Sequence, residues 1–125
     1  ANVVARVPGR DARLRGEHVL FSGHHDHDGV RNPVSLADDA RRGVVDSVWH
    51  GADDNATVSA ALLAIGRAFA RHPGPRTALF VWHGAEERGL LGSRWYAARP
   101  TVPRPSIVAV LNADMIGRNH PDTAA

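Results

Sequence analysis

The chain has 125 residues, of which 43% are hydrophobic and 22% are charged, and this composition is ordinary for a globular domain with one core. It contains no cysteine, which excludes disulfides and thiolate metal ligands. Its formal net charge is only +2, and its arginines are scattered among acidic residues, so nucleic-acid binding is not expected. No apolar run approaches the roughly 20 residues of a membrane-spanning helix, so no membrane span is expected either.

Strand-like and helix-like patterns alternate along the chain. Strands are predicted at residues 2–7, 18–23, 76–82 and 107–111, and helices at about 56–71 and 89–98. The polar stretch 30–50 is predicted to be a long loop, with a short strand at 44–49. This alternation indicates an α/β protein, a three-layer sandwich around a largely parallel, mixed central sheet.

The predicted helix at 56–71 has the clearest periodicity. Four apolar residues recur at helical spacing and share one face: Val58, Leu62, Ile65 and Phe69. Asp54 or Asn55 is expected to cap the start of this helix, and the His-Pro-Gly-Pro segment at 72–75 is expected to end it.

Polar side chains gather where the predicted elements meet one edge of the sheet. They follow three buried strands or precede a helix, and they are His24, Asp26, Asp54, Glu86, Glu87 and Asp114. In sheets of this kind, ligands bind at the carboxyl ends of the strands. Each residue also has an ordinary explanation when it is taken alone, because histidines cluster on surfaces and acids favour helix starts.

The set as a whole favours a metal site. Carboxylates that lie close together repel one another unless a cation compensates their charge. A mixture of imidazole and carboxylate ligands suits zinc and, less specifically, manganese or cobalt. Two neighbouring glutamates can divide the work, since one can hold a metal while the other moves a proton.

Four stretches occur together in an order that carries a family resemblance. They are FSGHHDH at 21–27, GADDNAT at 51–57, GAEERGLLGS at 84–93 and NADMIGR at 112–118. With them the chain resembles, over nearly its whole length, the M28 family of zinc aminopeptidases and carboxypeptidases. The resemblance implies the zinc-exopeptidase fold, a peptide substrate, hydrolysis of N-terminal peptide bonds by a zinc-activated water, and a parent protein exported to the periplasm or the extracellular space.

The resemblance also implies a ligand set for two zinc ions. His24 and Asp114 would bind one zinc, Glu87 would bind the other, and Asp54 would bridge both. The peptide bond between Asp54 and Asn55 would be cis. Glu86 would be the general base, and Asp26 would orient the ring of His24.

One ligand of the family pattern is missing. Family members carry a further histidine, well downstream of the Asp-Met motif, on the zinc that Glu87 binds, and His120 follows Asp114 too closely to replace it. His25 and His27 are given no role. Because the downstream histidine is missing from this chain, we expect residues 1–125 to be a partial catalytic domain of a longer parent, with one of its two zinc sites better supported than the other. Alone, it should have weak activity or none.

Two alternatives stay open at this stage. Some relatives of this fold have lost ligands and serve as non-catalytic binding modules, but every ligand within range of this chain is present. A related M20-type zinc deacylase or peptidase is the other alternative. The Asp-Asp-Asn and Glu-Glu-Arg-Gly-Leu-Leu-Gly-Ser segments argue against that assignment.

Overall fold

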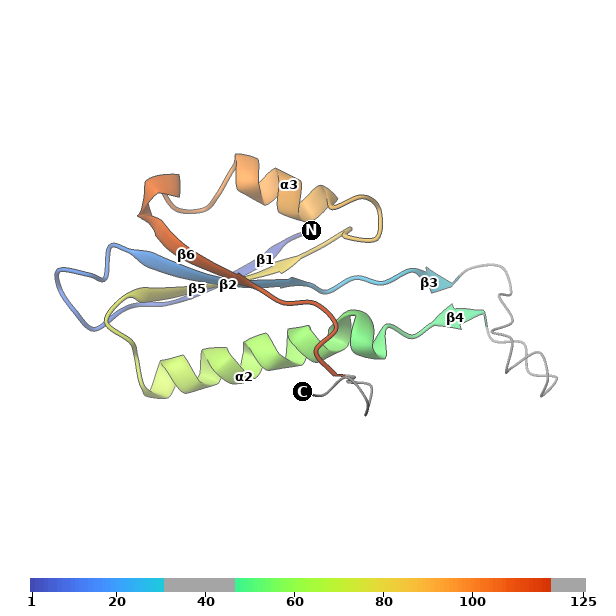
Figure 1. Cartoon of the computed structure of the whole chain (residues 1–125), viewed down its shortest axis with the longest axis horizontal. Coiled ribbons are helices and arrows are strands. Elements are labelled where there is room, and N and C mark those ends of the chain that lie inside the picture. Colours follow the sequence, from blue (N-terminus) through green and yellow to red (C-terminus); the bar gives the residue numbers. More distant parts are fainter. Residues whose placement is uncertain (31–46, 118–125) are drawn as a thin grey trace, which may run out of the picture.

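The computed structural model describes residues 1–30 and 47–117. The loop predicted at 30–50 lies largely outside these residues, as does His120. Part of the short strand predicted at 44–49 is described, and it is β4 (Val48–Trp49), which pairs antiparallel with β3 (Gly29–Val30). This small hairpin extends beyond the end of the main sheet (Figure 1).

The main sheet has four strands in the order β1-β5-β2-β6. Its two central strands, β2 (His18–His24) and β5 (Thr77–His83), are parallel, and β6 (Ile107–Asn112) is parallel to β2. Only β1 (Val3–Val7) runs antiparallel, against β5. The prediction of a largely parallel mixed sheet is therefore confirmed.

One helix covers each face of this sheet, α2 (Val58–Arg71) on one side and α3 (Leu91–Ala98) on the other (Figure 1). Successive side chains of a strand point to opposite faces, and β5 uses both. Its Ala78 and Phe80 belong to the core under α2, while its Leu79 and Val81 belong to the core with Tyr96 of α3. This arrangement is the expected three-layer sandwich.

The apolar face predicted for α2 lies against the sheet. Val58 and Leu62 are fully buried, and Ile65 and Phe69 pack against the same core. The predicted cap is wrong, because the helix begins at Val58 and no side chain caps it. Asp54 and Asn55 have non-helical backbone angles within the preceding turn η1 (Ala52–Thr57).

The two glutamates lie in the turn between β5 and α3, not in the helix. Helix α3 starts at Leu91, two residues later than predicted, and its first turn contains no acidic residue. The main-chain carbonyl of Glu86 accepts hydrogen bonds from the N–H groups of Gly89 and Leu90, which closes the turn. The attraction of acids to a helix N-terminus therefore does not account for Glu86 and Glu87.

Strand β6 lies at one edge of the sheet and presents an apolar surface. Val108, Val110 and Leu111 are each about half exposed. An uncovered apolar edge of this kind is a surface on which another segment can pack. Among the residues that the structure describes, neither helix combines the length and the apolar character needed to cross a membrane.

Candidate metal centre

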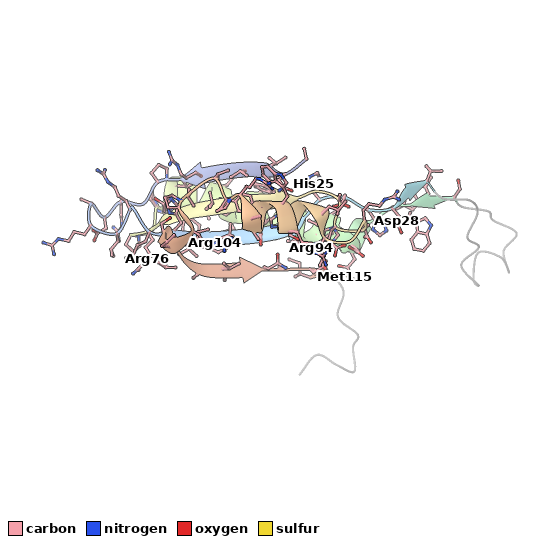
Figure 2. All side chains as sticks on the ribbon, turned by 90° about the horizontal axis from the view of Figure 1, so that it is seen from above. His25, Asp28, Arg76, Arg94, Arg104 and Met115 are labelled. Carbon is pink, nitrogen blue, oxygen red and sulfur yellow. The ribbon has the colours of Figure 1, made fainter. Side chains whose placement is uncertain are left out.

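The predicted site residues meet at the carboxyl ends of the parallel strands. His24 is the last residue of β2, and Asp26 and His27 follow it. The turn after β5 carries the two glutamates, and Asp114 follows β6. Figure 2 shows Asp28 and Met115 toward this end of the molecule and Arg76 toward the opposite end. The parallel strand order thus brings together acids that are far apart in sequence.

His24 is the most enclosed residue of the centre, with 4% of its side chain exposed. Its Nδ1 lies 3.0 Å from the main-chain carbonyl oxygen of Asp26. A carbonyl only accepts, so Nδ1 carries a proton, and whenever the ring is neutral the lone pair of Nε2 points into the site. There Nε2 lies 3.0 Å from Oδ1 of Asp54 and 3.3 Å from Oδ1 of Asp114.

The electrostatics of this pocket favour positive charge. Burial alone would lower the pKa of His24, but the Asp26 carbonyl and the charges of Asp114, Glu86 and Asp54 outweigh it, and the pKa is raised. A set of carboxylates that favours a cationic imidazole also favours a divalent cation.

Asp54 provides the strongest test of whether a metal fits. Its Oδ1 is buried and has no hydrogen-bond partner, although Nε2 of His24 is only 3.0 Å away. A buried carboxylate oxygen without a partner is costly. A cation bound by Oδ1 of Asp54 and Nε2 of His24 would give that oxygen a partner and remove the cost. The residues present therefore fit a metal ion.

Two groups of possible ligands share Asp54. One is His24, Asp54 and Asp114, and the other is His27, Asp54 and Glu87. Within each group, one ligand atom from every residue lies within 4.8 Å of the others. Ligand atoms around a zinc ion, each about 2.0–2.2 Å from it, are roughly 3–4 Å apart. The distances from Nε2 of His24 to its two carboxylates are 3.0 and 3.3 Å, and those from Nδ1 of His27 to its two carboxylates are 2.8 and 4.0 Å, which is close to this spacing.

Glu86 lies close to both groups and forms a third with His24 and Glu87. Burial is the largest cause of its raised pKa, and the carboxylates of Glu87, Asp114 and Asp26 add to it, while His24 opposes it. A carboxylate with a raised pKa next to a metal site is suited to accept and return a proton.

Asp26 contributes in a way that the sequence did not indicate. Its carboxylate lies 3.7 Å from Nδ1 of His24, whereas its main-chain carbonyl is the closer partner of that ring. Its Oδ1 and Oδ2 instead accept the N–H groups of Glu86 and Glu87, at 3.0 and 3.3 Å. Asp26 thereby fixes the turn that carries both glutamates.

Asp26→Asn is expected to lower the free energy of unfolding of the metal-free protein by about 1.5–3 kcal/mol at pH 7, the usual value for hydrogen bonds to a charged group. Burial would raise the pKa of Asp26, but the N–H groups of Glu86 and Glu87 outweigh it, and the pKa lies below its ordinary value of 3.8. A lowered folded-state pKa gives stability that is present above pH 3.8 and is lost as the pH falls through the folded-state pKa. Urea unfolding should therefore show a wild-type advantage at pH 7 that shrinks toward pH 3. An advantage of equal size at both pH values would contradict this role.

The turn η1 is tied to the segment that follows β6. Oδ1 of Asn55 accepts the N–H of Met115 at 3.3 Å, and Oδ1 of Asp53 accepts the N–H of Gly117 at 2.8 Å. The peptide bond between Asp54 and Asn55 is cis, as the resemblance implies. These contacts hold Asp54 and Asp114 next to each other, and no local sequence pattern could have shown them.

His27 is the residue of this site to which the sequence assigned no role. Its Nδ1 lies 2.8 Å from Oε1 of Glu87 and 4.0 Å from Oδ2 of Asp54. The neighbouring His25 is exposed, and its Nε2 is 3.0 Å from the main-chain oxygen of Ala1, away from the two ligand groups. For His27, the only signal in the sequence was its position three residues after His24.

The fold and the two ligand groups that share Asp54 define an α/β protein with a candidate two-metal centre. The model of peptidase family M28 matches residues 2–125, and the chain belongs to this family.

Three relatives illustrate the similarity. Leupeptin-inactivating enzyme 1 of Streptomyces exfoliatus is 34% identical over 96% of this chain and 23% of the relative. A probable zinc metalloprotease of Pyrenophora teres f. teres is 31% identical over 94% of the chain and 23% of the relative. Leucine aminopeptidase 1 of Aspergillus oryzae is 29% identical over 93% and 28%. The chain thus spans about a quarter of the length of these relatives.

Proposed function

We propose that this chain carries most of the active site of a two-zinc exopeptidase that removes residues from the N-terminus of peptides. The buried, unpartnered Oδ1 of Asp54, directed at His24 between two ligand groups, is the observation that carries the proposal. The name of the Aspergillus oryzae relative, leucine aminopeptidase 1, supports the choice of reaction.

Each residue has a distinct task in this proposal. His24 and Asp114 would hold one metal ion, Glu87 would hold the other, and Asp54 would be shared by both. When bound, the metal pair would polarise the scissile carbonyl and lower the pKa of the attacking water. Asp26 keeps both glutamates in place through their N–H groups.

Glu86 moves the proton. As a carboxylate it accepts a proton from the attacking water, and as a carboxylic acid it returns that proton to the nitrogen of the leaving amine. Burial raises the pKa of Glu86, which makes its carboxylate a stronger base than an ordinary glutamate and suits it to accept the proton. In this proposal Asp54, Glu87 and Asp114 would hold metal. Among the described residues, Glu86 is then the carboxylate beside both ligand groups that remains available to move a proton.

The experiment is a hydrolysis assay on the full-length protein that contains this chain. We expect release of nitroaniline from an aminoacyl-nitroanilide, loss of this activity in a chelator, and recovery when Zn²⁺ is restored. The matched substrate with an acetylated N-terminus should not react. Release of acetate from the N-acetylated substrate, without release of nitroaniline, would favour the M20-type deacylase. A metal-loaded protein that cleaves neither substrate would overturn the proposal.

A further inference from the structure

Asp114 is the least enclosed member of the ligand group that it forms with His24 and Asp54. Its side chain is 51% exposed, compared with 33% for Asp54 and 4% for His24. Packing around the side chain therefore does little to direct its carboxylate. The direction depends instead on the main chain that carries Asp114, and this chain has already left β6, whose last residue is Asn112.

The residue after Asp114 has a strained backbone. Met115 has a φ of 51°, in the left-handed region that a residue with a Cβ rarely adopts. Strain of this kind persists only where surrounding contacts hold the chain in place. A contact from elsewhere in the fold must therefore hold Met115 in this conformation.

Asn55 supplies that contact. Its Oδ1 accepts the N–H of Met115 at 3.3 Å, and Asn55 is itself buried, with 2% of the residue exposed. The other end of the amide, Nδ2, is buried without a hydrogen-bond partner. The oxygen is therefore the end of this side chain that anchors the segment after Asp114.

The same segment lies directly against η1. The N–H of Gly117 donates to Oδ1 of Asp53 at 2.8 Å, and a Cβ at Gly117 would clash with Cγ2 of Thr57. A glycine permits this close approach because it has no Cβ. The chain after Asp114 is thus attached to η1 at two points, Met115 and Gly117.

We propose that Asn55 is a positioning residue for the first metal ion, the ion of the ligand group that contains His24 and Asp114. By holding the N–H of Met115, it keeps Oδ1 of Asp114 directed at Nε2 of His24, 3.3 Å away. This inference rests on the proposed function, because it assumes that two metal ions bind. It gives a role to a buried amide that lies outside the ligand groups.

A second route from Asn55 to the metals runs through its neighbour Asp54, and the two routes have different consequences. Support of Asp54 affects both ions, because both ligand groups share Asp54. Support of Asp114 affects one ion, because Asp114 belongs to one of these two groups. The number of ions that bind more weakly therefore identifies the route.

The experiment titrates the metal-free full-length protein that contains this chain with Co²⁺, followed by calorimetry and by absorption spectroscopy. In Asn55→Ala, we expect one Co²⁺ to bind about 10–100-fold more weakly and the other to bind as in wild type. Asp114→Ala is the reference and should keep only that other ion, with the same absorption spectrum. Asn55→Asp keeps an oxygen that can accept the N–H of Met115, so it should restore most of the lost affinity.

A measurement without metal tests the hydrogen bond itself. In the metal-free protein, the amide hydrogen of Met115 should exchange faster in Asn55→Ala than in wild type. Asn112→Ala is the matched control, since it makes the same change two residues before Asp114, where Oδ1 of Asn112 accepts the hydroxyl of Ser22 instead. It should leave the exchange of the Met115 amide and the binding of both ions as in wild type.

Several results would overturn the inference. Weaker binding of both ions by Asn55→Ala would place its effect at Asp54, and unchanged binding of both would show that Asp114 does not depend on it. Unchanged exchange of the Met115 amide, or an Asn55→Asp variant that binds as weakly as Asn55→Ala, would exclude the hydrogen bond as the cause. Failure of wild-type protein to bind any Co²⁺ would instead overturn the proposed two-metal function.

Thermal unfolding in chelator keeps these outcomes interpretable, and metal-free Asn55→Ala should unfold cooperatively. If this variant does not fold, Gly117→Ala tests the same attachment to η1, because the added methyl group has to move the segment away from Thr57. It should weaken the same Co²⁺ ion, and unchanged binding of both ions would count against the inference.

Discussion

Asp54→Asn is expected to abolish binding of both metal ions and, with them, all metal-dependent hydrolysis. Asp54 belongs to both ligand groups, and its Oδ1 is buried without a hydrogen-bond partner. Asparagine has a single oxygen and no charge, so it cannot bridge two cations. Elemental analysis of dialysed protein, together with the aminoacyl-nitroanilide assay, measures both effects.

Asp53→Asn is the matched control for this variant. Asp53 precedes Asp54 directly, and its Oδ1 accepts the N–H of Gly117, which an asparagine oxygen can also do. This variant should keep both ions. Without metal, Asp54→Asn should be no less stable than wild type, because it removes one of several neighbouring carboxylates. Retention of both ions by Asp54→Asn would show that Asp54 does not bridge them.

Glu86→Gln is expected to lower the rate of hydrolysis by about 10²–10⁴-fold while the protein keeps both metal ions. Glutamine is close to glutamate in size, but it cannot accept and return a proton. The measurement is kcat on the aminoacyl-nitroanilide, with the metal content determined on the same sample.

Glu87→Gln makes the same change one residue later and should give a different result. Because Glu87 is placed among the ligands of the second metal, this variant should lose that ion. A rate for Glu86→Gln within tenfold of wild type would show that Glu86 is not the general base. Loss of metal from Glu86→Gln would assign it instead to the ligand group that it forms with His24 and Glu87.

These predictions depend on how the fold concentrates charge. Parallel strands end at one edge of the sheet, and each adds acids or imidazoles there, so the metal-free site holds several carboxylates around a largely buried histidine. The raised pKa of His24 reflects this concentration. A divalent cation neutralises the charge of these carboxylates more completely than a proton on the imidazole does. This is the physical reason to expect metal binding.

Much of the fold could be predicted from the sequence because it depends on neighbouring residues. The spacing of Val58, Leu62, Ile65 and Phe69 placed one face of α2 against the sheet, and that face is the one that packs there. The apolar segments at β2, β5 and β6 indicated buried parallel strands, with bounds within one residue of those observed. The prediction of burial is wrong for β6, which is largely exposed because it lies at the edge of the sheet. The residues expected to bind metal follow from ordered motifs, each of which is a short local pattern.

The tertiary structure alone decided the contacts between distant segments. The sequence suggested Asp54 or Asn55 as a helix cap, but the side chain of Asn55 reaches a loop 60 residues away. Asp26 was expected to hold a ring, and its carboxylate holds the backbone of a turn 60 residues away. His27 ends the FSGHHDH motif, which assigned it no role, and it lies beside Glu87 because two loops meet at one edge of the sheet. Local propensity fixes which element a residue joins, but the packing of the sheet and its loops determines which side chains meet.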